Sequence, residues 1–154
     1  AGDTDMMLRK RRDKVVSVHG PENKYTLLMD GHIADRFGSR LIGLIGTRSL
    51  GTGKGLLIYP CGSVHTWFMS MPIDVVYVSS ANRVVGVDRN LRPWHIGTLR
   101  RGVRYVIEVA ANGASQVEPG DRLTLVGWVP PRKPRTCIGD RARAKGSGSC
   151  SQCG

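Results

Sequence analysis

The sequence contains no run of about 18 or more apolar residues, the length that a membrane-spanning helix needs. Its basic start does not lead into the apolar stretch of a secretory signal peptide. We therefore expect no transmembrane segment and a cytoplasmic protein. A first residue of Ala1 instead of Met is also consistent with trimming at the N-terminus.

Acidic residues are scarce: 12 stand against 23 lysines and arginines, which gives a net charge of +11. Such a balance says more about partners than about fold, and it is compatible with nucleic acid, an anionic membrane or an acidic protein. Solvated tails are the simpler explanation for the charge at the two ends. The middle of the chain adds six arginines: Arg83, Arg89, Arg92, Arg100, Arg101 and Arg104.

Helix-favouring runs are also rare, whereas glycine occurs 20 times and short Val, Ile and Thr runs alternate with turn residues. This pattern predicts a mainly β protein, with an α+β fold as the alternative. We expect a small closed or partly closed β-barrel of about seven or eight short strands. The expected strands are 15–18, 25–29, 56–59, 64–69, 74–78, 83–87, 105–110 and 123–128.

One stretch has a helical period. Apolar residues at Ala34, Phe37, Leu41 and Leu44 predict a covering helix near 32–46. The chain then divides into a disordered basic arm at 1–14, a barrel domain at 15–129 and a flexible, basic, cysteine-containing tail at 130–154, where prolines end the folded region.

A series of short motifs occurs in a fixed order between Asp35 and Asp121. They are RLIGLIG at 40–46, GLLI at 55–58, HTWFM at 65–69, MPIDVVY at 71–77, VVGV at 84–87, PW at 93–94, VIEV at 106–109 and PGD at 119–121. In this order they resemble the family known as domain of unknown function 192 (DUF192), small bacterial and archaeal proteins. Ile45, where the family usually has Met, departs from the pattern. The resemblance implies a compact β-rich barrel but no established activity.

Three residues could serve catalysis. Cys61 and His65 are the minimal nucleophile pair, because an imidazole lowers the pKa of a neighbouring thiol. Asp74 lies in an apolar run, where a carboxylate is either a perturbed acid or is held by backbone N–H groups at the Met71-Pro72 bend or by an arginine. The structural alternative is a buried cysteine and a hydrogen-bonded histidine.

A ligand pocket is a second possibility. It would form if the loop at 92–95 folds over the segment 61–74, which would gather apolar and polar groups as ligand sites do; a barrel core has a similar composition. Glu108 poses the same question as Asp74, although strand alternation can simply place it outward. The expected pocket residues are His65, Trp67, Met69, Asp74, Trp94 and His95.

The C-terminal cysteines Cys137, Cys150 and Cys153 supply three of the four ligands of a structural zinc site. A redox or disulfide pair is a further alternative, and a flexible tail is the simplest explanation. We therefore expect no cofactor, with zinc at these cysteines as the alternative.

Together these observations favour a non-enzymatic ligand-binding or accessory module, whose partner is an unknown small molecule or protein. The first alternative is a Cys/His/Asp- or metal-dependent enzyme at the same site. The second is a polyanion binder that contacts nucleic acid through arginines and lysines.

Overall fold

The computed structural model describes residues 15–34, 49–67 and 69–131. The described residues are mainly β, as the sequence predicts, with a single short 3-10 helix, η1 (Pro21–Asn23). The strands are β1 (Val15–His19), β2 (Thr26–Ala34), β3 (Lys54–Ile58), β4 (Ile73–Ser79), β5 (Val84–Leu91), β6 (Val103–Ala110) and β7 (Thr124–Val126).

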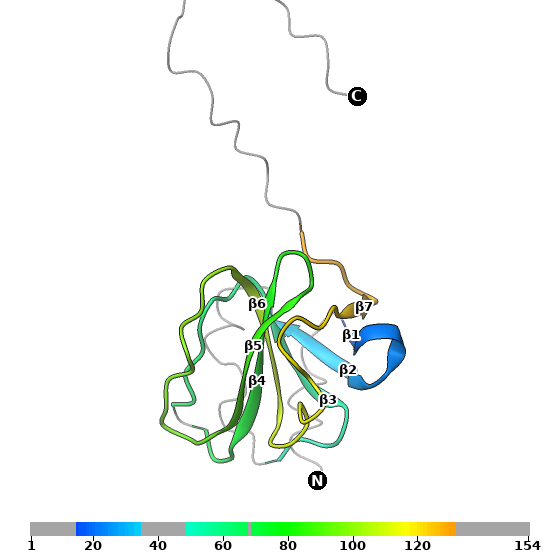
Figure 1. Cartoon of the computed structure of the whole chain (residues 1–154). Helices are drawn as coiled ribbons and strands as arrows, with labels where there is room; N and C mark the ends of the chain where they lie inside the picture. Colours follow the sequence, from blue (N-terminus) through cyan, green and yellow to red (C-terminus); the bar gives the residue numbers. More distant parts are fainter. Residues whose placement is uncertain (1–14, 35–48, 68, 132–154) are drawn as a thin grey trace, which may run out of the picture.

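The strands form one curled sheet in the order β5-β4-β6-β3-β2-β1-β7 (Figure 1). Neighbours run antiparallel except β2 and β3, which are parallel. The two hairpins expected from turn residues are present: β1 pairs with β2, and β4 pairs with β5.

The two ends of the sheet meet at the start of β5. An antiparallel bridge joins Arg83 to Arg122, just before β7. The Leu123 amide donates to the Asn82 carbonyl at 2.8 Å, and the Val84 amide donates to the Asp121 carbonyl at 2.9 Å. These bonds partly close the sheet into the predicted barrel.

The inner face of the sheet holds the larger core. Val76 on β4, Ile107 on β6 and Leu57 on β3 lie in one cross-strand row and are fully buried. The Trp128 ring covers this core from beyond β7, with edge contacts to Tyr59 at 5.3 Å and Tyr105 at 6.3 Å between ring centroids.

The outer face of the central strands is buried as well. Leu56, Val75 and Val106 point outward yet are buried. Val64 and Met69, from the loop between β3 and β4, cover them and form a second apolar cluster with them. Burial on both faces explains why β4 reads as an almost continuous apolar run instead of alternating.

The predicted helix near 32–46 is wrong at its start. His32–Ala34 are the last three residues of β2, where they pair with β1 on one side and with β3 on the other. These two ladders occupy the backbone groups that a helix would use. The rest of that stretch lies outside the described residues.

The expected strand 64–69 is wrong: its described residues form no strand, and His65 makes only an isolated bridge, to Ile96. The proposed arm at 1–14, and the tail from residue 132 onward, lie outside the described residues. Within the part that the structure describes, no helix is long and apolar enough to cross a membrane.

Gly55 on β3 allows a close approach of strands and tests this packing. A methyl group there would lie 2.3 Å from the Glu108 carbonyl oxygen and 2.7 Å from Leu28 Cδ2. We expect Gly55→Ala to lower the free energy of unfolding by about 3 kcal/mol or more, measured by urea denaturation. Gly62→Ala is the matched control, because a methyl group at Gly62 meets nothing within 4 Å. Equal stability of the two variants would contradict the packing.

Candidate functional site

Two loops that are distant in sequence pair with each other on the outer side of the barrel. The Thr66 amide donates to the His95 carbonyl at 2.8 Å, and the Trp94 amide donates to the Thr66 carbonyl at 3.0 Å. The Gly97 amide donates to the Val64 carbonyl at 2.9 Å. The segment 92–95 thus packs against the segment that contains His65, the juxtaposition on which the predicted pocket depends.

Thr66 fixes this loop pair with its side chain. Its hydroxyl is fully buried, donates to the Arg92 carbonyl at 2.6 Å and accepts from the His95 amide at 2.9 Å. A buried hydroxyl with both partners satisfied holds the two loops in one conformation. Sequence reasoning missed Thr66, because an isolated threonine in a predicted strand carries no distinctive signal.

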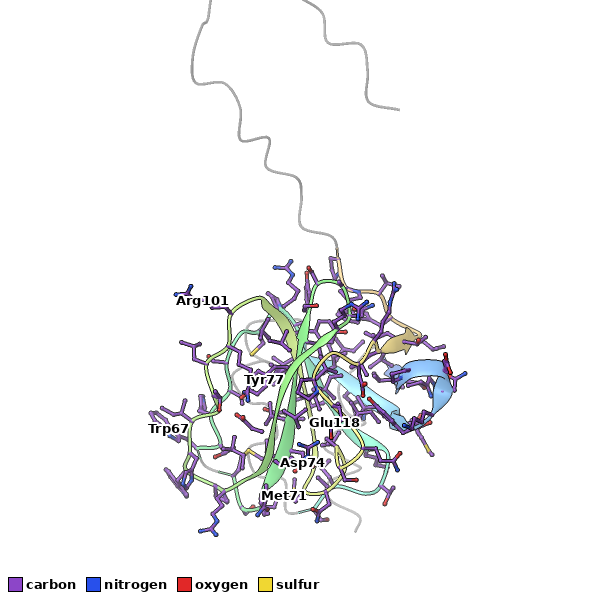
Figure 2. All side chains as sticks on the ribbon, in the orientation of Figure 1. Trp67, Met71, Asp74, Tyr77, Arg101 and Glu118 are labelled. Atoms are coloured by element: carbon purple, nitrogen blue, oxygen red, sulfur yellow. The ribbon has the colours of Figure 1, made fainter. Side chains whose placement is uncertain are left out.

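Four large apolar side chains on the loop pair point toward solvent. Trp67 is 46% exposed, Trp94 61%, Ile96 68% and Leu99 81%. We call these four residues the apolar loop surface. Trp67 projects from the edge of the molecule, on the side opposite β1, β2 and β7 (Figures 1 and 2). The exposed His65 ring lies 5.3 Å from the Trp67 ring, between centroids.

The predicted pocket residues therefore separate into three places. His65, Trp67, Trp94 and His95 all lie on the loop pair and are exposed. Met69 is buried beneath, in the outer cluster. The sixth residue, Asp74, lies on the other face of the sheet.

Asp74 points into the barrel and has a structural role there. It pairs with Val109, whose side chain belongs to the inner core. Its carboxylate accepts from the Asn90 amide at 2.8 Å and from the Ala114 amide at 3.1 Å. Backbone donors were one of the two expected sources, but they come from β5 and the 112–117 turn instead of the Met71-Pro72 bend.

Cys61, His65 and Asp74 do not come together. Cys61 is partly buried against the outer cluster, and its thiol donates to the Ser63 carbonyl at 2.9 Å. Asp74 lies across the sheet from both. No group of three or more His, Cys, Asp or Glu side chains in the described ranges could hold a metal ion. The proposed zinc ligands Cys137, Cys150 and Cys153 lie outside those ranges.

A polar network that sequence reasoning missed anchors the far end of the second loop. Asp88 on β5 accepts from the Tyr77 hydroxyl at 2.8 Å, from the Thr98 amide at 2.6 Å and from Arg100 at 2.9 Å. The Arg100 guanidinium also lies 4.5 Å from the centre of the Tyr77 ring. Gly86 leaves the room that this guanidinium fills, since a methyl group there would collide with it.

Charge in this network is balanced inside the molecule. Burial alone would raise the pKa of Asp88, but hydrogen bonds from Thr98, Arg100 and Tyr77 lower it below its usual value. Burial and the bond to Asp88 raise the pKa of the Tyr77 phenol. Asp88 is therefore a carboxylate and Tyr77 a neutral phenol at neutral pH. Because neither group changes its protonation state near pH 7, the pair holds the loop and does not serve as an acid or base there.

The six central arginines differ in exposure and in partners. Arg83, Arg89, Arg92 and Arg101 are exposed, whereas Arg100 and Arg104 are partly buried. Four of them bind acceptors of the protein itself: Arg83 the Gly120 carbonyl, Arg89 the Val117 carbonyl and Glu118, Arg100 Asp88, and Arg104 the Tyr59 hydroxyl.

Glu108 lies on the outward face of the sheet, as strand alternation predicts. It shares its face with Val106 as predicted, but that face is covered, and Glu108 is only 3% exposed. Its Oε2 atom has no hydrogen-bond partner in the part of the chain that the structure describes. Burial raises the pKa of this carboxyl to about 7.

The chain belongs to the DUF192 family, described as "Uncharacterized ACR", whose model matches residues 16–125, more than half of the chain. This confirms the resemblance read from the motifs. A UPF0127 protein of the archaeon Thermococcus kodakarensis is 30% identical over 105 residues, which are 64% of this chain and 64% of that protein. The chain thus covers less than two thirds of this relative.

Two crystal structures share the fold. A Sinorhizobium meliloti protein, provisionally described as a transcription regulator, superposes with a TM-score of 0.64 at 23% identity, over 73% of this chain and 93% of that one. A protein of unknown function from Novosphingobium aromaticivorans gives 0.63 at 19% identity, over 71% and 83%. At these identities the likeness supports the fold alone.

Thr66→Val tests the loop anchor, because valine keeps the shape but leaves the His95 amide without its acceptor. We expect hydrogen exchange at the His95 amide to accelerate about tenfold or more, measured by NMR, which corresponds to about 1.4 kcal/mol or more of lost protection. Thr124→Val, at an exposed position on β7, is the control. Unchanged exchange in Thr66→Val would show that the hydroxyl does not hold the loops.

Glu108 predicts a pH dependence of stability. Since its pKa rises from 4.5 unfolded to about 7 folded, the folded protein binds more protons between these values and stability falls as pH rises through this window. From about pH 5 to about pH 8 this group costs about 2–3 kcal/mol, which Glu108→Gln removes. Denaturation at both pH values measures it, with exposed Glu118→Gln as control. An unchanged slope in Glu108→Gln would contradict the raised pKa.

Proposed function

We propose that this protein is a non-enzymatic binding module and that the apolar loop surface is its binding site. One observation carries the proposal: four large apolar side chains point toward solvent from loops whose backbone is held in place. Single exposed apolar residues are common, but a group of them on one pair of loops is typical of an interaction site.

The rigidity of the loop pair supports binding. Thr66 holds one end of the second loop, and Asp88 holds the other through Thr98 and Arg100. Loops that are already ordered lose less conformational entropy when a ligand binds, so more of the contact energy remains as affinity. Function commonly resides on loops that a rigid scaffold positions in this way.

The charge around the apolar loop surface indicates the class of ligand. The segments 61–67 and 92–102 contain neither Asp nor Glu, whereas Arg92, Arg100 and Arg101 lie in the second. Because Arg100 is already paired with Asp88, Arg92 and Arg101 set the local charge. A ligand that is apolar and negatively charged matches this surface.

The enzymatic alternative has less support. Asp74 lies across the sheet from Cys61 and His65, where it accepts from the Asn90 and Ala114 amides, and the Cys61 thiol donates to the Ser63 carbonyl. A nucleophile and its base need to lie within hydrogen-bond reach of each other. The polyanion alternative loses Arg100 and Arg104, which are partly buried and bound to Asp88 and to the Tyr59 hydroxyl.

Binding of 8-anilinonaphthalene-1-sulfonate, an apolar anion that fluoresces in apolar surroundings, tests the proposal. We expect saturable binding to the native protein, weakened about fivefold or more in the double variant Trp67→Ala/Leu99→Ser. Val129→Ser is the matched control, since Val129 is 79% exposed outside the loop pair. Near-ultraviolet circular dichroism checks that each variant keeps native packing.

Two results would contradict the proposal. One is equal dye binding by the loop variant and the control, which would place the site elsewhere. The other is loss of dye binding in Cys61→Ser while the loop variant binds normally, which would place the binding site at Cys61.

A further inference from the structure

The apolar loop surface combines two kinds of side chain on one side of the molecule. Trp67 and Arg101 both project from the same edge, away from β1, β2 and β7 (Figure 2). Trp94, Ile96 and Leu99 are each more than half exposed on the loop between β5 and β6. Arg92 and Arg101 flank them in sequence. Large apolar groups between arginines are suited to a boundary between an apolar and a charged phase.

Part of the backbone under these side chains is already hydrogen-bonded within the molecule. Four amides of the second loop have acceptors within the molecule: Trp94 on the Thr66 carbonyl, His95 on the Thr66 hydroxyl, Gly97 on the Val64 carbonyl and Thr98 on Asp88. A loop that enters the apolar part of a bilayer needs such pairing, because lipid tails offer no acceptor to an N–H group.

We infer that the apolar loop surface docks onto the surface of an anionic lipid bilayer, an inference that rests on the proposed function and names its partner. Tryptophan prefers the headgroup region, where its ring is apolar and its N–H stays wet. Leu99 and Ile96 enter the acyl boundary. Arg92 and Arg101 remain at the level of the phosphates, since long basic side chains extend toward charge while their stems contact apolar groups.

The experiment is sedimentation of the full chain with sucrose-loaded vesicles of phosphatidylcholine, with or without about 30% phosphatidylglycerol. We expect partitioning onto the anionic vesicles to be about tenfold stronger than onto neutral ones, and to weaken as salt rises to about 0.5 M. Tryptophan emission shifts to the blue on binding, because Trp67 and Trp94 leave water while Trp128 is buried in both states.

Matched variants separate the two contributions. Trp67→Ala/Leu99→Ser lowers partitioning about fivefold or more on anionic vesicles and removes most of the blue shift. Arg92→Gln/Arg101→Gln reduces the preference for anionic over neutral vesicles. Arg122→Gln, the same change at an exposed site next to β7, leaves partitioning within about twofold of the parent.

Failure of this inference is distinguishable from failure of the proposed function. If the protein binds the dye through the loops but no vesicles, the binding module stands and its partner is a protein or a small molecule. Vesicle binding that persists unchanged in Trp67→Ala/Leu99→Ser would place the contact in the basic ends of the chain and would overturn the inference. If Trp67→Ala/Leu99→Ser binds both the dye and the vesicles as strongly as the parent does, the proposed function and this inference are both wrong.

Discussion

Burial of β3, β4 and β6 on both faces is the constraint on which the rest of the structure depends. The inner face closes around Val76, Ile107 and Leu57, and partial closure of the sheet satisfies its edge. The outer face must be covered by loops, and Val64 and Met69 supply that cover. The loops are therefore part of the core on their inner side, which is why their tips can be rigid and exposed at once.

The buried and partly buried polar side chains of the barrel and its loops affect the structure in different ways. Asp74 and Thr66 are satisfied by amides from other segments, so each fastens a turn or a loop to the sheet. Asp88 likewise fastens the second loop, because it accepts from the Thr98 amide and pairs with Arg100. Glu108 is the exception, since its Oε2 atom has no partner among the described residues and its pKa rises to about 7. Thr66 and Asp88 hold the loop surface and Asp74 holds the 112–117 turn, whereas Glu108 weakens the fold as pH rises.

The function proposed from this arrangement needs no chemistry at the loop tips. A scaffold that fixes two loops by buried hydrogen bonds and leaves Trp67, Trp94 and Leu99 outside is suited to recognition. The same internal pairing of loop amides that gives rigidity also makes the loops compatible with a lipid surface. The proposed binding and the proposed membrane docking thus rest on one structural feature, the pair of fixed loops.

The sequence by itself determined the class of fold, the two hairpins and the family, because short β-branched runs, turn residues and ordered motifs are local signals. It also indicated that 92–95 could meet the segment with His65. Only the tertiary structure decided the faces: Asp74 inward, Glu108 covered and His32–Ala34 in a strand. Side-chain alternation specifies that neighbours on a strand point opposite ways, but which side is covered depends on distant loops. The partners of Thr66 and Asp88 lie 26 to 29 and 10 to 12 residues away, where no local pattern can identify them.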